Sequence, residues 1–561
     1  MLHFFLAYQG VITETLAIAV VLTIGYCMLP RTSRWLYAVE RGLGRLACWR
    51  WLSIILVGLL GLGSSATLSL LGHVPEPQVH DEFSYLLAAD TFAHGRLSNP
   101  THPMWVHFES FHIIQQPTYA SKYPPAQGLM LALGQVVGGH PIVGVWISMG
   151  LACAATYWML LAWLPGWWAM LGAALAILHP GILHWWGWSY WGGTVAMMGG
   201  ALVFGASRRI VRRPRGRDAL LLGGGLAVLA NSRPYEGLVV SLPVAVLLLA
   251  WMLGKNGPTA RVAIERIVLP IFVVLAVTGG AMGFYHWRVT GNALRMPYAV
   301  HEETYSVPPV FLWQQPRPMP AYRHIALRDF NIEQFNWYKK QQSTSGLLRV
   351  IKKKVEELWL FYQGERLRPM LTIPLVMLLW MLKDRWFRFA LVTCGVLFAG
   401  LLVETMVWPH YAAPVTALVL ALILQGMRHL RLWHWRSQPV GQLVVWTLAL
   451  LTIASFLVGF MERVRAQPAG RKVNRAHILA QLKAEKGRHL VIMRYGPQHS
   501  PHNEWVYNAA DIDGAQVVWA REMDAVHNRK LLEYFKDRQV WLVEEDHVPP
   551  KLVPYPHDLY P

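Results

Sequence analysis

Charged residues are scarce in this sequence. Of its 561 residues, 15% are charged and 54% are apolar. That composition excludes an ordinary soluble protein and predicts one that crosses a membrane several times. The charge present is unbalanced, with 51 Lys and Arg against 32 Asp and Glu. Much of the excess lies in short Arg-rich segments between apolar runs, a pattern that indicates orientation in a membrane better than nucleic-acid binding.

Cysteine and processing signals are also sparse. No Asn-x-Ser/Thr acceptor is usable, because proline blocks Asn99-Pro100-Thr101, and this favours a bacterial protein. The start of the chain lacks the basic stretch and cleavage site of a signal peptide, so residues 4–29 are predicted to be a retained span. The four cysteines show no spacing typical of a disulfide framework or a metal site: Cys27, Cys48, Cys153 and Cys394.

Long apolar runs dominate what remains. A span needs about 20 apolar residues, and about twelve such runs are predicted. The 27 tryptophans suit two interfacial belts. The predicted spans are 4–29, 51–71, 141–164, 167–184, 190–207, 217–232, 235–253, 267–287, 369–382, 386–406, 409–427 and 440–461.

One short apolar segment decides the predicted topology. Residues 126–137 have about half the length of a span. If this segment lies in the interface, the positive-inside rule is satisfied, because all the basic loops then share the cytoplasmic side. Both termini then lie outside, with segments 72–140 and 288–368. The basic loops are 31–50, 208–217, 254–266, 383–388 and 428–436.

Three parts of the chain follow from this topology. Residues 1–50 are an extra span and a basic loop, and residues 51–461 are the main transmembrane domain. In residues 462–561, apolar strand-like runs alternate with helical runs, which predicts a small extracytoplasmic α/β domain. This tail has no Gly-rich phosphate loop, so no chemistry is assigned to it.

The chain carries its most distinctive motifs just after the span at 51–71. Asp81-Glu82 opens a predicted helix that ends near Gly95, in the pattern D-E-x-x-Y-L. Tyr123-Pro124-Pro125 then begins a second, interfacial helix, and Arg233-Pro234 lies at a later outer edge. Over residues 50–290 these features resemble the GT-C superfamily of polyprenyl-phosphate-sugar-dependent glycosyltransferases. The likeness is to the branch of protein O-mannosyltransferases and aminoarabinose transferases.

The resemblance implies a reaction and roles for residues. An outer-loop acid, Asp81 or else Glu82, acts as base on an acceptor hydroxyl, and the sugar leaves a polyprenyl phosphate with inversion. Lys122 and Arg233 hold the donor phosphate. A divalent ion, Mg or Mn, is allowed, although no ligand set is readable. Weaker candidates for substrate binding are Tyr123, Tyr190, Glu236, His410 and Tyr411.

Plainer interpretations stand beside these roles. Asp81 could cap its helix, and Glu82 could be a first-turn helix charge. Lys122 could extend to the lipid headgroups, Arg233 could pair with Glu236, and Asp90 could lie on a solvated face. His410 and Tyr411 could be interface anchors. The family's frequent second acid is missing from residues 179–193. Glu302 and Glu303, in segment 288–368, are candidate substitutes.

The sequence therefore predicts a polytopic α-helical, GT-C-like membrane glycosyltransferase of a bacterial inner membrane. Its partners are a polyprenyl-phosphate sugar, membrane lipid and an acceptor that is a glycan, a lipid or a protein, with no nucleic acid. Two rivals remain. One is a ligase or polymerase of lipid-linked glycans, and the other is a transporter of twelve spans, against which no inverted repeat is visible.

Overall fold

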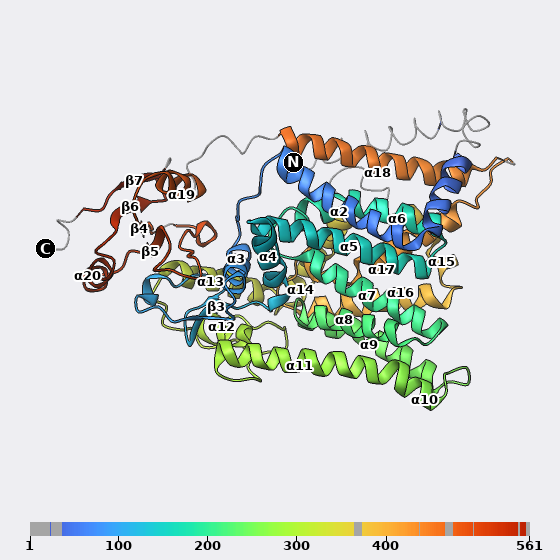
Figure 1. Ribbon diagram of the computed structural model, residues 1–561, viewed down its shortest axis with the longest axis horizontal. Helices are drawn as coiled ribbons and strands as arrows, with labels where there is room; N and C mark the ends of the chain where they lie inside the picture. Colours follow the sequence, from blue (N-terminus) through green and yellow to red (C-terminus); the bar gives the residue numbers. More distant parts are fainter. Residues whose placement is uncertain are drawn as a thin grey trace. The chain divides into compact units, whose positions relative to one another are not determined.

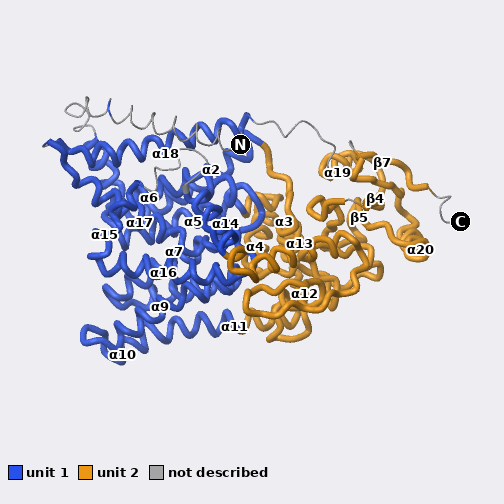
Figure 2. Tube along the Cα trace, turned by 180° about the vertical axis from the view of Figure 1, so that it is seen from behind, with its two compact units in different colours: residues 1–72, 145–279, 348–465 blue, residues 73–144, 280–347, 466–561 orange. Residues whose placement is uncertain are grey.

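The computed structural model describes Thr23 and residues 36–363, 373–436, 438–465, 475–497, 499–547 and 550–556. The predicted span 4–29 and Cys27 therefore lie outside the described residues, apart from Thr23. The chain forms two compact units (Figure 2). Unit 1 comprises residues 1–72, 145–279 and 348–465, and unit 2 comprises residues 73–144, 280–347 and 466–561. Each unit is built from three separate stretches of sequence.

Unit 1 is a bundle of apolar helices (Figure 1). Its core gathers buried residues such as Tyr157, Trp186, Phe204 and Phe387 from several helices. The helices that lie in it, wholly or in part, are α2 (Arg50–Leu71), α5 (Pro141–Trp163), α6 (Gly166–Leu178), η2 (Gly181–Trp186), α7 (Gly193–Arg212), α8 (Gly216–Ala230), α9 (Pro234–Leu253), α10 (Ala260–Ala263), η3 (Ile264–Val268), α11 (Leu269–Thr290), α14 (Thr344–Gln363), η4 (Ile373–Met377), α15 (Leu378–Met381), α16 (Arg385–Val403), η5 (Pro409–Val415), α17 (Thr416–Leu430) and α18 (Val440–Arg465).

Seven helical segments among the described residues are long and apolar enough to cross a membrane. They expose large apolar side chains, such as Phe272 and Val277 on α11, which water would disfavour. The chain is accordingly an integral membrane protein. The predicted total of twelve spans stays a prediction, since α6, α7 and α8 fall short of these criteria and part of 369–382 lies outside the described residues.

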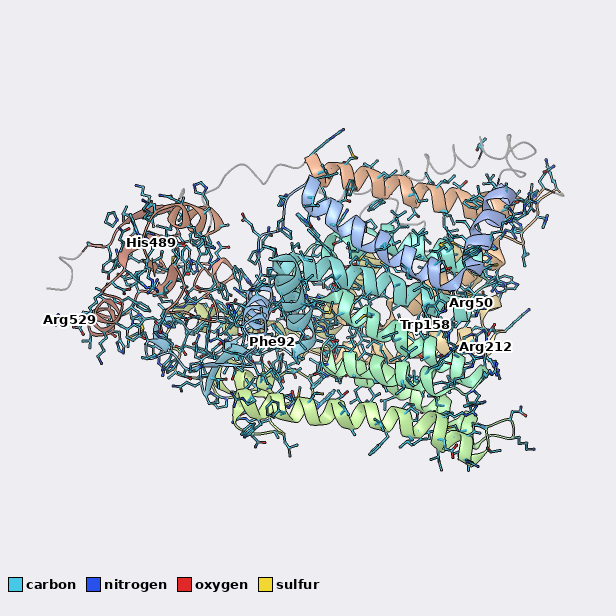
Figure 3. The ribbon with its side chains drawn as sticks, viewed as in Figure 1. Arg50, Phe92, Trp158, Arg212, His489 and Arg529 are labelled. Carbon is cyan, nitrogen blue, oxygen red and sulfur yellow. The ribbon has the colours of Figure 1, made fainter. Side chains whose placement is uncertain are left out.

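Small residues on α7 allow close packing. A Cβ atom on Gly200 would lie 1.8 Å from the carbonyl oxygen of Pro414 in η5, so no larger residue fits there without movement of the backbone. On the same helix the Arg209 guanidinium lies over the ring of Trp158, with 3.8 Å to the ring centroid (Trp158 and Arg212 are labelled in Figure 3). The polar side chain thereby finds a partner at the helix end.

Unit 2 is built around the helix pair α3 (His80–Ala93) and α4 (Pro125–Gly138). A Cβ on Gly128 would lie 2.7 Å from the Cβ of Ala88, so α4 packs directly on α3, beside Phe92 (Figure 3). Pro125 occupies the first turn of α4, as predicted. The other elements of residues 73–144 and 280–347 are β1 (Asn99–Pro100), η1 (Trp105–His107), β2 (Ile113–Ile114), β3 (Thr118–Ser121), α12 (Pro297–Tyr305) and α13 (Ile325–Lys340).

The tail contributes a mixed sheet to unit 2. Its strands follow the order β5-β4-β6-β7, with β4 parallel to β5 and β6, and β7 antiparallel to β6. Leu490 and Val518 of this sheet share a core with Leu87 of α3 and Tyr119 of β3. Separate folding of the tail therefore stays a prediction. Its elements are α19 (Arg475–Ala484), β4 (His489–Arg494), η6 (Pro501–Asn503), β5 (Val517–Arg521), α20 (Ala525–Tyr534), β6 (Gln539–Glu544) and β7 (Lys551–Pro554).

Candidate active site

Asp81 and Glu82 have different structural tasks. Helix α3 begins at His80 with Val79 as its N-cap, so the interpretation of Asp81 as the cap is wrong. Instead, Glu82 closes the helix end, because its Oε2 accepts hydrogen bonds from the backbone N–H groups of Gln78 (2.8 Å) and Val79 (3.3 Å). Glu82 is buried, in agreement with the plainer interpretation of a first-turn charge. The side chain of Asp81 therefore remains available for another role.

The carboxylate of Asp81 is bound through one oxygen, and the side chain is partly exposed. Its Oδ1 accepts a hydrogen bond from the Tyr123 hydroxyl, at the start of α4, and lies 3.3 Å from Nε2 of His112. Among the described residues, its Oδ2 accepts no side-chain hydrogen bond. The side chain is 29% exposed, whereas that of His112 is 13% exposed. One carboxylate oxygen is thus oriented by the protein, and the side chain as a whole stays partly exposed.

His112 is placed by an unusual backbone conformation. Its φ is 61°, in the left-handed region that costs energy for a residue with a Cβ. Its carbonyl oxygen accepts hydrogen bonds from Ser84 Oγ of α3 (2.6 Å) and from the N–H of Lys122 (3.2 Å), which hold it there. Burial, and next the charge of Lys122, keep the pKa of His112 well below its usual value. A neutral imidazole therefore faces Asp81.

Lys122 forms a buried ion pair. Its Nζ lies 3.1 Å from Oε1 of Glu302 in α12, and their side chains are 6% and 9% exposed. The interpretation that Lys122 extends to lipid headgroups is therefore wrong. Burial alone would raise the pKa of Glu302, but the charge of Lys122 and a hydrogen bond with His301 bring it below its usual value. Glu302 is therefore the carboxylate partner of Lys122. Glu303 pairs instead with Arg295.

The residues from the later outer edge lie in unit 1. Arg233 precedes α9, and its Nη1 lies 3.8 Å from Oε1 of Glu236, the pairing that the plainer interpretation predicted. The Arg233 guanidinium also lies over the ring of Tyr411, with 4.6 Å to the centroid. His410 contacts Tyr411 edge to face. Unit 1 thus brings four of the predicted residues together, while the fifth residue predicted there, Tyr190, is buried.

The tail reaches α3, which the sequence did not reveal. Tyr507 Oη lies 2.7 Å from His80 Nδ1, next to Asp81 in sequence. The N–H of Ala510 donates to Oδ2 of Asp90 (2.7 Å). Asp90 is therefore a contact between α3 and the tail, and the prediction of a solvated face is wrong. Only the fold shows these contacts, because more than 400 residues separate the partners in each pair.

His112 and His301 are the site residues that sequence reasoning missed. His112 was one of five histidines in residues 80–128, with no spacing that set it apart. Its ring lies 5.8 Å from that of His301, centroid to centroid. The Lys122 ammonium already neutralises Glu302, so the set around Asp81 does not fit a divalent ion. Within the described residues, the donor atoms close enough to share an ion belong to His499, Glu545 and Asp546 of the tail.

The sequence matches no protein-family model and no curated protein. Among solved structures it is similar to ArnT from Cupriavidus metallidurans bound to undecaprenyl phosphate, with 11% identity over 88% of this chain and 92% of that chain and a TM-score of 0.46. It is also similar to the apo oligosaccharyltransferase of Archaeoglobus fulgidus, with 12% identity over 87% of this chain and 69% of that chain and a TM-score of 0.49. Both proteins are members of the GT-C superfamily.

Proposed function

We propose that this protein is a glycosyltransferase that moves a sugar from a polyprenyl phosphate to an acceptor hydroxyl, with Asp81 as the base. The observation that carries the proposal is the asymmetry of the Asp81 carboxylate. Tyr123 and His112 occupy Oδ1, and the side chain is partly exposed. A general base needs a fixed carboxylate oxygen within hydrogen-bond reach of the substrate proton, and Oδ2 meets the first requirement.

The chemical step follows from this arrangement. The acceptor hydroxyl gives its proton to Oδ2 of Asp81 while its oxygen forms a bond to the anomeric carbon of the donor sugar. The bond from that carbon to the phosphate oxygen breaks, and the polyprenyl phosphate leaves with the electron pair. Attack and departure on opposite faces invert the anomeric centre. Tyr123 keeps the carboxylate oriented throughout, because its buried phenol has a pKa well above its usual value and stays protonated.

The departing phosphate needs positive charge. Lys122 and Arg233 are the proposed cations, and each already has a carboxylate neighbour, Glu302 or Glu236. The Arg233 contact is the longer of the two, at 3.8 Å against 3.1 Å, so a phosphate would displace it at lower cost. Arg233 is therefore the stronger of the two proposals in electrostatic terms. No step is assigned to a metal ion.

The side of the membrane is part of the proposal. The charge rule places residues 72–140, 288–368 and the tail outside, and unit 2 consists mainly of parts of these same three segments. One continuous unit is what three segments on the same side would form. We place Asp81 at the outer face of a bacterial inner membrane. Labelling of Asp81→Cys in intact cells with a membrane-impermeant maleimide tests this, and labelling only after lysis would contradict it.

The reaction is tested with purified protein, a panel of labelled polyprenyl-phosphate sugars and membrane extract as the acceptor source. Products are identified by mass. Asp81→Asn keeps the shape of the side chain and removes the base, so transfer should fall by about 10²- to 10⁴-fold. Asp329→Asn is the matched control, because Asp329 is a partly exposed acid paired with Arg328 in unit 2. Undiminished transfer by Asp81→Asn would remove Asp81 from the mechanism, and transfer only from diphosphate-linked glycans would favour the ligase.

A further inference from the structure

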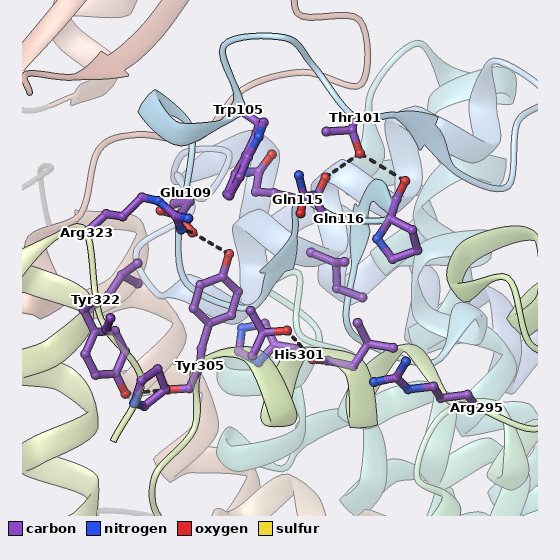
Figure 4. Close-up of a pocket in the computed structure, with 17 residues that line it drawn as sticks. Thr101, Trp105, Glu109, Gln115, Gln116, Arg295, His301, Tyr305, Tyr322 and Arg323 are labelled. Atoms are coloured by element: carbon purple, nitrogen blue, oxygen red, sulfur yellow. Dashed lines mark hydrogen bonds and ion pairs between the residues drawn. The ribbon is translucent and has the colours of Figure 1, made fainter. Parts of the chain in front are cut away.

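Unit 2 contains a cavity of about 620 Å³ that no step above uses. It lies between residues 101–117 and residues 295–327, and its lining includes Trp105, Glu109, Gln115, Tyr305 and Arg323 (Figure 4). Its volume is within the usual range of small-molecule sites, roughly 300 to 1,000 Å³. A space of this size in a compact unit calls for an occupant that matches its lining.

Two buried oxygen atoms of the lining residues lack hydrogen-bond donors. Glu109 is 2% exposed; its Oε1 accepts from Tyr305 Oη (3.0 Å) and Arg323 Nη1 (3.3 Å), but its Oε2 has no hydrogen-bond partner. Oε1 of Gln115 is also buried without a partner, while its Nε2 donates to the carbonyl of Phe108 (2.6 Å). Buried acceptors without donors are costly. Neither oxygen is accessible from the cavity. The accessible polar side chains of the lining include Gln116 and Thr304, which suit an occupant that brings O–H groups.

The positive charges of the lining already have partners. Arg323 lies 3.3 Å from Glu109, and Arg295 forms an ion pair with Glu303. An anionic ligand such as a phosphate would have to break one of these pairs, so the lining favours a neutral occupant. Trp105, Tyr305 and Tyr322 add aromatic surface, which suits the apolar C–H faces of a ring. A neutral ring that carries several hydroxyls meets all of these conditions.

We infer that this cavity binds a sugar ring of the acceptor, so that the acceptor is a carbohydrate or carries one. The identification of the occupant as part of the acceptor rests on the proposed function. Its identification as a sugar rests on the lining of the cavity alone. His301 and Tyr305 line both this cavity and a smaller one that His112, Lys122 and Glu302 also line. A sugar in the large cavity would therefore be separated by a single layer of side chains from the cluster beside Asp81. Because a donor sugar carries a phosphate and the cations here are paired, the acceptor is the better occupant.

The test is a binding measurement without donor, which needs no turnover. The full-length protein is purified in a detergent without a sugar headgroup, since a maltoside could occupy the cavity itself. Saturation-transfer NMR then measures binding of methyl glycosides of glucose, mannose, galactose and N-acetylglucosamine. Binding of at least one glycoside to the unaltered protein is expected. The absence of a binding signal from all four glycosides would overturn the inference.

Three variants locate the site. Glu109→Gln removes the charge that holds Tyr305 and Arg323 at the wall of the cavity, and should weaken binding at least about tenfold. Thr304→Trp, at an exposed position of the lining, should fill the cavity and abolish binding. Glu333→Gln is the matched control, because Glu333 is an exposed acid of unit 2 outside the cavity, and binding should be unchanged. Unaltered unfolding temperatures confirm that the variants fold. Binding by folded Glu109→Gln and Thr304→Trp that equals that of the unaltered protein would overturn the location.

Two further arms separate this inference from the proposed function. Asp81→Asn should bind the glycosides like the unaltered protein, so loss of transfer with retained binding supports both ideas. If Asp81→Asn transfers sugar at the full rate while glycoside binding still depends on Glu109, Asp81 is not the base and the sugar site is nevertheless supported. Displacement of the glycosides by a polyprenyl-phosphate sugar, but not by polyprenyl phosphate alone, would overturn the assignment to the acceptor.

Discussion

The buried pair Lys122–Glu302 allows a direct test of whether Lys122 serves structure or the donor phosphate. Three variants are needed: Lys122→Met, Glu302→Met and the double variant Lys122→Met/Glu302→Met. Each single change leaves one buried charged or polar partner without its counterpart. The double change replaces both with apolar side chains of similar length. Its comparison with the single variants isolates the energy of the pair.

The expected magnitude follows from the burial of the pair. With side-chain exposures of 6% and 9% and a separation of 3.1 Å, both groups are largely desolvated. Removal of one partner from such a pair typically costs about 3 to 5 kcal/mol, whereas replacement of both by apolar groups is close to neutral. For a unit of this size, 1 kcal/mol corresponds to roughly 2 to 4 °C in Tm. Lys122→Met should therefore lower Tm by about 6 to 20 °C, and the double variant should recover most of that loss.

Thermal unfolding in detergent, followed by intrinsic tryptophan fluorescence, measures these shifts, and sugar transfer is measured on the same samples. A single variant whose Tm stays within about 2 °C of the unaltered protein would refute the reasoning. If the double variant is stable but inactive, Lys122 also contacts the donor phosphate. If it is stable and active, the role of Lys122 is structural and Arg233 remains the proposed phosphate ligand.

Two further predictions concern helix α3 and pH. Glu82→Ala should destabilise the protein by about 1 kcal/mol, the usual value of a helix cap, and leave transfer per folded molecule unchanged, whereas a loss of turnover would return Glu82 to the candidate bases. Burial lowers the pKa of His301 to about 4 and that of His324 to about 3, with the charges of Lys122 and Arg521 as the next causes. The unfolded chain binds these protons near pH 6.5, so stability should fall as the pH drops below 6.5, by about 2 kcal/mol per histidine at pH 5. Tm measured from pH 8 to pH 5 tests this. His301→Gln or His324→Gln should reduce the fall of Tm with decreasing pH. An equal fall of Tm in the variant and in the unaltered protein would contradict the prediction.

Periodicity was sufficient to predict the local elements of unit 2. The helix that begins near Asp81, the Pro125 start of α4 and the tail strand at residues 489–494 were readable because hydrophobic spacing and proline act over a few residues. The position of Glu82 as a first-turn helix charge was readable for the same reason, but its role as the cap was not, because the sequence offered Asp81 for that role. The two backbone donors of Glu82 lie three and four residues earlier in the chain.

The pairing of charges was not readable. The sequence suggested that Lys122 binds the donor phosphate or extends to the lipid headgroups, but its partner Glu302 lies 180 residues further along the chain. Asp90 carried no sign that the backbone of Ala510 would bind it. Glu109 and its cavity were invisible for the same reason, since the lining comes from two distant stretches of the chain. Such contacts depend on how segments pack, and one sequence holds no record of the distance between them.

The sequence by itself determined that the chain is an apolar, helical membrane protein with an acidic pair at the start of a helix, because hydropathy and local spacing require no knowledge of partners. The tertiary structure alone decided which member of that pair is occupied as a cap, which neutral imidazole faces the other, and which carboxylate neutralises Lys122. The physical reason is that hydrogen bonds and ion pairs act over about 3 to 4 Å, and only the folded chain brings residues so far apart in sequence within that distance.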